Sequence, residues 1–368
     1  MTEVYDIAVI GAGMAGSSLA AELAPHARVL VAEAENIPGY HATGRSAAFW
    51  EECYGGPAVV PLTLASGPYL HEQGLLSPRG ALYIGRAADE AAIEAFMARF
   101  AGSGVHIEKL GRAGLAEHIP GLRPEWTLAI AEPGCADIDV AGLHQHYLAR
   151  IRRAGGELRV GVRLEAAERE GEGWRLSFGR AGEARARVLV DAAGAWADEV
   201  ASLAGARPLG IAPLRRTVIQ VRTDPPPPAD LPLVLDIAGR FYFKPEHGRL
   251  WLSPHDETHS PPCDSAPEEL DVALAIDRLE QVVDWRVAGV ERKWAGLRSF
   301  APDRLPVYGF DPLREGFFWF AGQGGFGIQT APAAARLATQ ALHGQPDDEM
   351  TRSLNASLYA PTRLHGLG

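Results

Sequence analysis

The sequence has few cysteines and no long apolar runs. Its three cysteines, Cys53, Cys135 and Cys263, are widely separated, and no C-x-x-C pair occurs. This spacing argues against a disulfide framework or a zinc site and favours a reducing compartment. No apolar run approaches the roughly 20 residues that a transmembrane helix needs. The N-terminus lacks a basic stretch followed by an apolar one, so we expect no secretory signal and a cytoplasmic location.

Positive charge is also in short supply. Lys and Arg number 35 against 46 Asp and Glu, which gives a formal net charge of −11. Because clusters of Lys and Arg make the contacts to phosphate backbones, we expect no nucleic-acid partner. The histidines show no metal-ligand spacing, so we expect no metal. A length of 368 residues, with 47% hydrophobic and 22% charged residues, is typical of a globular protein of about two domains.

The clearest motif lies at the N-terminus. Residues 5–10 (YDIAVI) are typical of a buried parallel strand, residues 17–24 of a helix and residues 28–32 of a second strand. Between the first strand and the helix stands a G-x-G-x-x-G loop, which consists of Gly11, Ala12, Gly13, Met14, Ala15 and Gly16. In this context the loop predicts dinucleotide binding, with the pyrophosphate at the helix N-terminus. Glu33 follows at the spacing of an acid that accepts from ribose hydroxyls.

The loop alone does not distinguish FAD from NAD, but its N-terminal position and the residues after it favour FAD. Further along the chain, the pattern predicts other elements. Helices are expected at 89–102, 140–154, 267–287 and 331–343, and strands within 157–193 and at 215–222, 241–244, 249–253 and 317–321, with a hairpin turn at 247–248.

Five segments, together with the Gly-rich loop, resemble the FAD-dependent D-amino acid oxidase and glycine oxidase superfamily in the order that the family shows. They are PGYHATGRSAAF at 38–49, ADID at 136–139 followed by Leu143, VLVDAAGAW at 188–196, WAGLRSF at 294–300 and GQGGFGIQT at 322–330. The likeness spans nearly the whole chain. It looks closest to the bacterial D-arginine dehydrogenase type of D-amino acid dehydrogenase.

The resemblance implies an α/β protein with two domains. A Rossmann-like FAD-binding domain is assembled from separated segments, and an α+β domain with an antiparallel sheet covers the flavin face and holds the substrate. We expect residues 1–85, 140–210 and 295–368 to form the first domain, and residues 86–139 and 211–294 the second.

The resemblance also implies which residues contact FAD. Besides the loop and Glu33, they are Gly44, Arg45, Ser46, Ala47 and Ala48 beside the isoalloxazine, Leu164 at the adenine, Ala193, Gly194 and Trp196 near the pyrophosphate and adenosine, and Arg298, Gly324, Gly325, Phe326, Gly327, Ile328 and Gln329 at the flavin ring. Thr43 or Ser46 as a helix cap, and Trp196 as a core aromatic, are alternatives. The cysteine that tethers flavin in sarcosine oxidases has no counterpart around 298–302, so we expect noncovalent FAD.

For the substrate, the resemblance assigns two arginines to a carboxylate. A guanidinium binds a carboxylate bidentately, and Arg298 and Arg216 are the candidates. A structural ion pair is the alternative for Arg298, and a solvated face, suggested by the neighbouring Arg215, is the alternative for Arg216. Tyr242 matches the tyrosine that closes the pocket and Tyr54 a second pocket tyrosine; either is alternatively a packing aromatic. Gln329 and the carbonyl of Gly325 are expected to take the amino group.

The sequence departs from the D-arginine dehydrogenase pattern at two positions. Ala81 stands where that type has an acid, and Phe49 where it has a histidine. Because a buried cation without a partner is costly, we expect neutral or apolar side chains on the substrate rather than those of arginine or lysine. Glu51 could replace the acid if it pointed inward, but we expect it on a solvated face.

The resulting hypothesis is an FAD-dependent dehydrogenase or oxidase. It oxidises the CH–NH2 group of a D-amino acid to an imino acid by hydride transfer to flavin N5. A secondary-amine oxidase for glycine, sarcosine or proline, or a 2-hydroxy acid dehydrogenase, is the alternative within the same fold. A flavin- or NAD-binding sensor without turnover is the alternative from another class. The electron acceptor, whether oxygen, a quinone or a protein, is not readable from the sequence.

Overall fold

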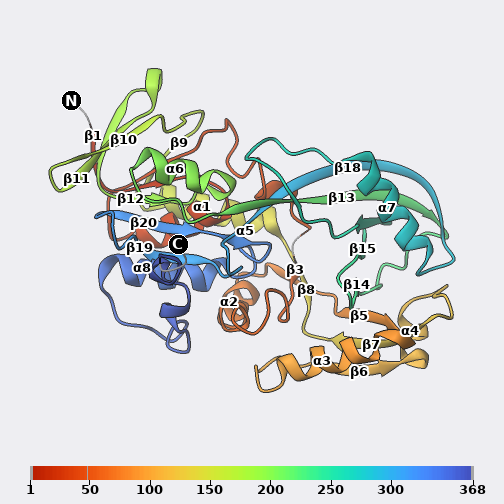
Figure 1. The fold of residues 1–368 in the computed structure, drawn as a ribbon. Helices are drawn as coiled ribbons and strands as arrows, with labels where there is room; N and C mark the ends of the chain where they lie inside the picture. Colours follow the sequence, from red (N-terminus) through yellow and green to blue (C-terminus); the bar gives the residue numbers. More distant parts are fainter. Residues whose placement is uncertain (1–2, 48, 366–368) are drawn as a thin grey trace.

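The structure is a computed structural model that describes residues 3–47 and 49–365. It has two lobes, one on each of two large sheets of 8 and 10 strands, with both termini on the same lobe (Figure 1). The mixed α/β fold expected from the sequence is confirmed.

The first sheet carries the N-terminal motif. Its order is β10-β11-β12-β1-β2-β9, with β20 on β12 and β19 on β20, and β9, β2, β1, β12 and β20 run parallel. The strands are β1 (Glu3–Ile10), β2 (Val29–Ala32), β9 (Glu157–Arg159), β10 (Ala166–Glu170), β11 (Gly173–Ser177), β12 (Glu183–Asp191), β19 (Val307–Phe310) and β20 (Phe317–Ala321). All four residues of β2 are buried, as expected of a parallel strand covered on both faces.

Helices cover both faces of this sheet. On one face α1 (Met14–Leu23) packs against α5 (Val140–Arg153) and α8 (Ala331–His343), and α8 also packs against α2 (Val60–Glu72). The other face carries α6 (Ala197–Leu203). The predicted strand–loop–helix–strand start and the helices near 140–154 and 331–343 are confirmed.

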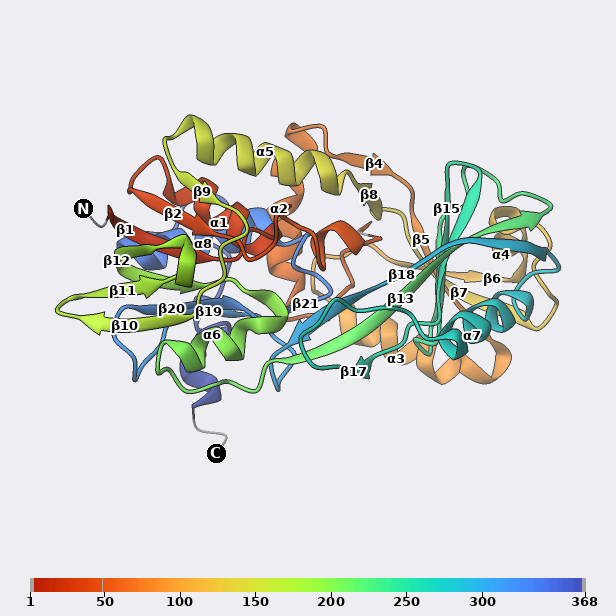
Figure 2. The same ribbon diagram turned by 90° about the horizontal axis from the view of Figure 1, so that it is seen from above.

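The second sheet is antiparallel except where β14 runs parallel to β5, and its order is β21-β18-β13-β16-β15-β14-β5-β7-β6, with β17 on β13. Its strands are β5 (Ala81–Arg86), β6 (Glu108–Gly111), β7 (Trp126–Glu132), β13 (Ala212–Asp224), β14 (Leu233–Asp236), β15 (Tyr242–Glu246), β16 (Arg249–Ser253), β17 (Thr258–His259), β18 (Arg286–Phe300) and β21 (Gln323–Gly324). The long pair β13–β18 reaches from one lobe into the other (Figure 2).

The remaining elements surround these sheets. A small sheet joins the lobes in the order β3-β8-β4, and three helices flank the second sheet. They are β3 (Phe49–Trp50), β4 (Leu76–Pro78), β8 (Ala136–Ile138), α3 (Glu90–Phe100), α4 (Arg112–His118) and α7 (Glu269–Glu280). Short 3-10 turns lie at Thr43–Arg45, Ala87–Asp89, Gly179–Ala181, Gly194–Trp196, Ala356–Leu358 and Pro361–Leu364.

Several elements differ from the sequence-based expectation. The helix expected at 267–287 ends at Glu280, because Val282, Val283 and Trp285 are buried against the second sheet and β18 starts at Arg286. The helices α2, α4 and α6 and several strands, among them β5, β6, β7, β14 and β19, were not expected. The second sheet also crosses two predicted domain boundaries, since it contains all of β5 and all of β18. The division into two domains stays a prediction.

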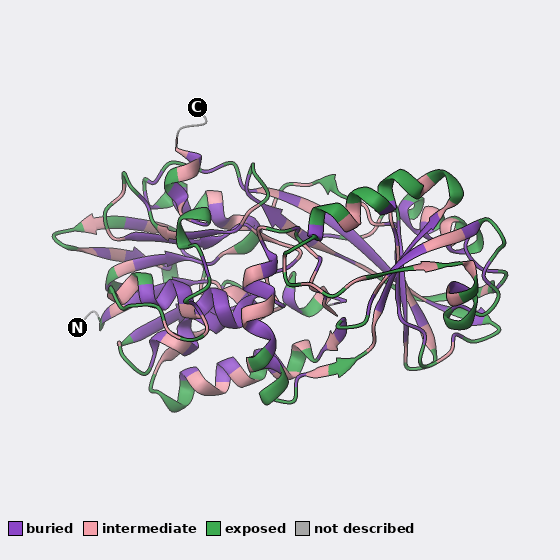
Figure 3. Ribbon diagram, turned by 90° about the horizontal axis from the view of Figure 1, so that it is seen from below, coloured by how far each residue is buried: buried purple, intermediate pink, exposed green. Residues whose placement is uncertain are grey.

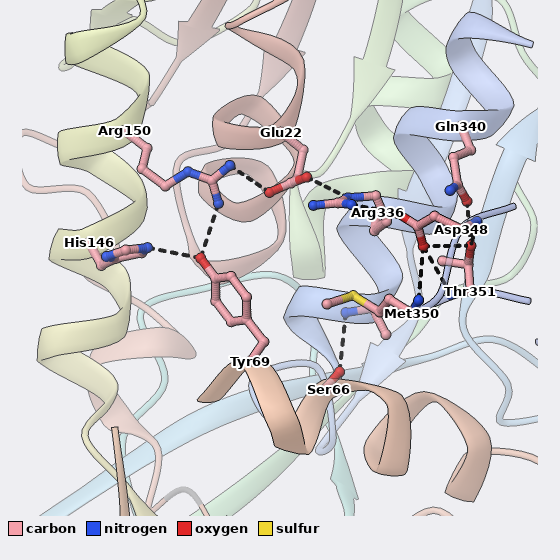
Figure 4. Close-up of polar contacts among 11 residues, drawn as sticks. Glu22, Ser66, Tyr69, His146, Arg150, Arg336, Gln340, Asp348, Met350 and Thr351 are labelled. Carbon is pink, nitrogen blue, oxygen red and sulfur yellow. Dashed lines mark hydrogen bonds and ion pairs between the residues drawn. The ribbon is translucent and has the colours of Figure 1, made fainter. Parts of the chain in front are cut away.

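Buried residues follow the strands of both sheets and the helices α1 and α8 (Figure 3). Four helices are also joined by a polar network (Figure 4). The Glu22 carboxylate of α1 accepts from Arg150 of α5 and from Arg336 of α8, each at 2.7 Å. Arg150 also donates to the hydroxyl of Tyr69 on α2, at 3.0 Å. One carboxylate thus ties α1 to both of its neighbours.

We expect Glu22→Gln to lower the free energy of unfolding by about 1–3 kcal/mol, because two partly buried guanidiniums lose a charged acceptor. Urea unfolding followed by circular dichroism measures this loss. Glu349→Gln is the matched control: that carboxyl is 92% exposed and 3.9 Å from Arg352, so its removal should change stability by less than about 0.5 kcal/mol. Equal effects of the two changes would contradict a structural role for the network.

Candidate active site

A continuous cavity lies between the two lobes. At one end it is lined by the Gly-rich loop and Glu33, and at the other by Arg216, Tyr242 and Arg298. Most of the predicted cofactor residues line it, namely Gly11, Gly13, Met14, Ala15, Glu33, Arg45, Ser46, Ala47, Leu164, Ala193, Gly194, Trp196, Arg298, Gly324, Gly325, Gly327 and Ile328. Ala12, Gly16, Gly44, Tyr54, Phe326 and Gln329 lie outside its lining, and Ala48 lies outside the described residues.

The Gly-rich loop is compact because side chains would not fit in it. Gly11 has φ +102°, and a Cβ there would lie 2.6 Å from the carbonyl oxygen of Ala192. A Cβ on Gly16 would lie 1.9 Å from the carbonyl oxygen of Gly11. Helix α1 therefore starts directly against the end of β1, with its N-terminus facing the cavity, where amide groups and the helix dipole favour a phosphate.

Three polar side chains hold the loop in place. Glu33 is buried, and its carboxylate accepts from the backbone N–H of Ala12 at 2.7 Å. The hydroxyl of Thr43 accepts from the N–H of Met14 at 2.9 Å, so Thr43 caps a helix other than the one expected for it. His144 on α5 contacts the carbonyl of Ala12 through Nε2 at 2.8 Å, and burial lowers its pKa, so the neutral ring donates this bond.

His144 was not among the predicted site residues. It also packs against Gly39, where a Cβ would lie 2.9 Å from its ring, so one histidine braces the Gly-rich loop and the loop that leads to Ala47. Only its place shortly after the ADID segment offered a signal.

Asp191 at the end of β12 was missed as well. Its side-chain oxygen accepts from the N–H of Ala193 at 3.1 Å, and burial raises its pKa well above the usual range.

Arg45 fixes the wall formed by residues 43–47. Its guanidinium donates to the carbonyls of Ser265 at 2.9 Å and Ala295 at 3.1 Å, and it pairs with Asp264. These bonds tie the loop to the second lobe. The side chain is therefore an anchor, and what the loop presents to the cavity is its backbone and the small residues Ser46 and Ala47.

The two candidate carboxylate-binding arginines come from neighbouring strands. Arg216 on β13 is paired with Gly296 on β18, two residues before Arg298. Arg298 donates to the hydroxyl of Tyr54 at 2.8 Å. Arg216 is 4% exposed, and its Nη1 has no hydrogen-bond partner among the described residues. Burial and the charge of Arg298 lower the pKa of Arg216 to about 10, so both stay charged at neutral pH.

Because the guanidiniums of Arg216 and Arg298 are both positively charged, an anion bound beside them would be stabilised. Arg216 has a carbonyl acceptor in Asp256 at 2.7 Å and a weak contact with Glu257 at 3.3 Å, which also pairs with Arg304. The neighbouring Arg215, by contrast, pairs with Glu268 and Asp271, so it is neither solvated nor free. A bidentate ligand carboxylate would satisfy the unpaired nitrogen of Arg216.

Tyr242 lies on β15 of the same sheet and lines the same cavity as these arginines. Its ring meets Phe49 edge-on at 6.2 Å and His255 at 5.8 Å. His255, which we did not predict, has φ +57° and contacts the carbonyl of Gly239 through Nδ1 at 2.6 Å. Burial, with Arg216 and Arg298 nearby, lowers its pKa to about 3, so it supports Tyr242 as a neutral ring.

The expectation for Glu51 is wrong. It is 4% exposed and lies in a turn, where its carboxylate accepts from the hydroxyl of Tyr83. Gln329 does not face the cavity either: its amide bonds the backbone of Glu51 and the hydroxyl of Thr63. It is therefore engaged with the protein rather than presented to a substrate amine, and the carbonyl of Gly325 remains the candidate for that group.

The site fits a dinucleotide that carries a flavin. It combines a glycine loop without room for side chains, a helix N-terminus, an acid at the ribose position and a second wall of glycines at 324–327. Among the described residues, no three His, Cys, Asp or Glu side chains form a group that could hold a metal ion. No helix in the described part of the chain is long and apolar enough to cross a membrane. These features define the class of flavin-binding oxidoreductases.

Comparison with known proteins gives the family. Residues 6–341 match the DAO family model, described as FAD dependent oxidoreductase. Because this match covers most of the chain, the protein belongs to the DAO family of FAD-dependent oxidoreductases, and FAD is its cofactor.

Individual relatives are more distant. The chain is 28% identical over 239 residues to glycine oxidase from Pseudomonas aeruginosa, which covers 62% of this chain and 61% of that protein. It is 26% identical over 200 residues to hydrogen cyanide synthase subunit HcnC from Pseudomonas aeruginosa, which covers 54% and 46%. The chain thus spans less than two thirds of the length of these relatives. The crystal structure of glycine oxidase from Geobacillus kaustophilus has the same fold, with a TM-score of 0.84, 22% identity and coverage of 98% and 99%.

Noncovalent attachment of the FAD stays a prediction. We expect acid or heat denaturation to leave intact FAD in the supernatant after centrifugation, because the residues Arg298 to Pro302 contain no cysteine. Absorbance of the supernatant and its chromatographic comparison with FAD measure this. Flavin that remains with the precipitated protein would show a covalent bond.

Proposed function

We propose that the protein oxidises the CH–NH2 group of a D-amino acid with a neutral or apolar side chain to an imino acid. The observation that carries this proposal is the pair Arg216 and Arg298, from paired strands, in the same cavity as the Gly-rich loop and Glu33. When bound, FAD supplies the hydride acceptor at its N5 atom. A small-molecule amine is therefore the proposed partner, and the electron acceptor is left open.

The residues of the chain orient the substrate. Arg298 and Arg216 hold the carboxylate, and Tyr54 fixes the direction of the Arg298 guanidinium through its hydroxyl. Tyr242 closes the pocket from the side of the second sheet. The carbonyl of Gly325 accepts from the amino group. With the carboxylate and the amine fixed, the Cα hydrogen has one direction in which to point, and such positioning accounts for much of the rate in reactions of this kind.

The proposed side-chain preference comes from an apolar cluster. Ala47, Ala81, Cys135, Leu233 and Tyr242 are buried together, with Phe49 packed against them. Ala47 and Tyr242 also line the cavity, so the cluster extends outward from the substrate position. Burial of a substrate side chain here is favourable by about 0.8 kcal/mol per CH2 group.

The position of Glu51 supports a second candidate for the substrate side chain, namely a cationic one. Glu51 points inward and lies near Arg298, contrary to the expectation from sequence. If its carboxylate reached the pocket, it would favour a cationic side chain, and the bacterial D-arginine dehydrogenase type would then be the nearer model. The carboxylate is bonded to Tyr83, however, and lies outside the cavity lining, so we prefer the apolar alternative.

A secondary-amine oxidase is the alternative reaction. The relatives in sequence and fold include glycine oxidases, whose names describe a primary amine without a side chain. The relatives in fold also include an L-proline dehydrogenase and an iminodiacetate oxidase, whose names describe secondary amines. A 2-hydroxy acid would use the same arginines, and its hydroxyl would also donate to the Gly325 carbonyl, so a comparison of substrates is needed to separate it from an amine.

We expect kcat/KM for D-leucine and D-phenylalanine to exceed that for D-arginine, sarcosine and 2-hydroxyglutarate. Ala81→Glu should raise activity on D-arginine more than on D-leucine, because it places a carboxylate in the apolar cluster. Steady-state kinetics with an artificial electron acceptor measure the five substrates. A kcat/KM of the parent that is tenfold higher for D-arginine than for D-leucine, about 1.4 kcal/mol, would contradict the proposed preference for apolar side chains. A higher kcat/KM for sarcosine than for the D-amino acids would favour the secondary-amine alternative.

A further inference from the structure

The turn after β3 carries Tyr54 to the carboxylate-binding arginine. The N–H of Tyr54 donates to the carbonyl of Glu51 at 3.2 Å, which closes the turn. The Tyr54 hydroxyl accepts from Arg298 at 2.8 Å, and its ring meets Phe326 edge-on at 5.9 Å. The position of residues 51–54 therefore sets the direction of the Arg298 guanidinium.

Two buried side chains hold this turn from different elements. Gln329, just before α8, donates to the carbonyl of Glu51 at 2.9 Å and accepts from its N–H at 3.3 Å. Glu132, the last residue of β7, accepts from the N–H of Glu52 at 2.6 Å and of Cys53 at 3.4 Å. Glu132 is 0% exposed and Gln329 2%. The first three residues of the turn thus have their backbone bound by side chains more than 70 positions away in the sequence.

A second buried carboxyl, that of Glu51, lies in the turn that Glu132 holds. Burial and the charge of Glu51 raise the pKa of Glu132, and burial raises that of Glu51.

We propose that Glu132 is a positioning residue for the substrate carboxylate: it holds the 51–54 turn through the N–H groups of Glu52 and Cys53, and so holds Tyr54 against Arg298. The kinetic part of this proposal rests on the proposed function, in which Arg298 holds a carboxylate. Glu132 itself touches neither the cavity nor Arg298. Its effect on a ligand should therefore pass through Tyr54.

A double-mutant cycle tests this route. The holoenzyme is titrated with benzoate, a simple carboxylate, and binding is followed by the change in the flavin spectrum. We expect Glu132→Ala and Tyr54→Phe each to weaken benzoate about tenfold, the size of one hydrogen bond to a charged group. The double variant should bind no more weakly than Tyr54→Phe alone. The control Glu52→Gln removes a neighbouring carboxyl that does not hold the turn, and should leave the affinity unchanged.

The outcomes separate the two proposals. If the parent does not bind benzoate, the carboxylate clamp fails, and with it the role of Glu132. If the parent binds benzoate but Glu132→Ala weakens it equally in the parent and in Tyr54→Phe, the clamp stands and the positioning role of Glu132 is overturned. Glu132→Gln, which keeps the volume and one acceptor, replaces Glu132→Ala in the cycle if the alanine variant does not fold.

Discussion

Gly16→Ala is expected to yield a protein that purifies with little or no flavin. The new Cβ would lie 1.9 Å from the carbonyl oxygen of Gly11 and 3.3 Å from a methyl carbon of Val9. The first contact is with backbone, so no side-chain rotation relieves it, and α1 must move away from β1. Overpacking of this kind costs about 1–3 kcal/mol, which corresponds to about tenfold to hundredfold weaker FAD binding if the loop alone shifts.

The ratio of flavin to protein absorbance after purification measures this loss, and circular dichroism shows whether the fold is retained. Gly114→Ala is the matched control: it lies in α4, where the nearest atom to a new Cβ is a side-chain carbon of Leu110 at 3.6 Å. A Gly16→Ala variant with the full FAD content of the parent would contradict the close approach of α1 to the loop.

Arg298→Met should lower kcat/KM for the amino acid substrate by about tenfold to a hundredfold. The change removes charge-assisted hydrogen bonds to the substrate carboxylate, worth on the order of 1.5–3 kcal/mol, while methionine keeps much of the volume. Amino acid amides should be poor substrates of the parent for the same reason. Arg292→Met on the exposed part of the same strand is the control and should leave kcat/KM unchanged.

Comparison of acid and amide substrates gives the sharper readout. The parent should prefer the acid, and Arg298→Met should lose most of this preference. Parent activity that is equal on the acid and its amide would contradict the clamp, whatever the effect of the substitution on the rate.

Local patterns account for the parts of the fold that the sequence predicted well. The strand at Glu3–Ile10, the loop and α1 follow from a short apolar run, three spaced glycines and a run of helix formers. The first half of β18 was missed for the opposite reason. Residues 286–293 are mostly exposed, half of them are charged, and they follow a strongly helical stretch, so only their pairing with β13 makes them a strand.

The same contrast applies to the site. Residues in the Gly-rich loop and in the segments near 193–196 and 324–328 were predicted from contiguous motifs, and most of them line the cavity. Glu51, Glu132 and His144 have no such motif. The environment of Glu51 and Glu132 is created by β5, β7 and the turn after β3, and that of His144 by the Gly-rich loop. An acid after an apolar pair is predicted to be solvated until Tyr83 and Gln329 are placed beside it.

We propose that an amino acid carboxylate and the flavin share one cavity. This proposal is tested by anaerobic addition of D-leucine to the purified holoenzyme, with the flavin absorbance band at roughly 450 nm as the signal. We expect the band to bleach with D-leucine in the parent and much more slowly in Arg298→Met. Flavin that stays oxidised with every D-amino acid and secondary amine, in a protein that dithionite reduces, would contradict it.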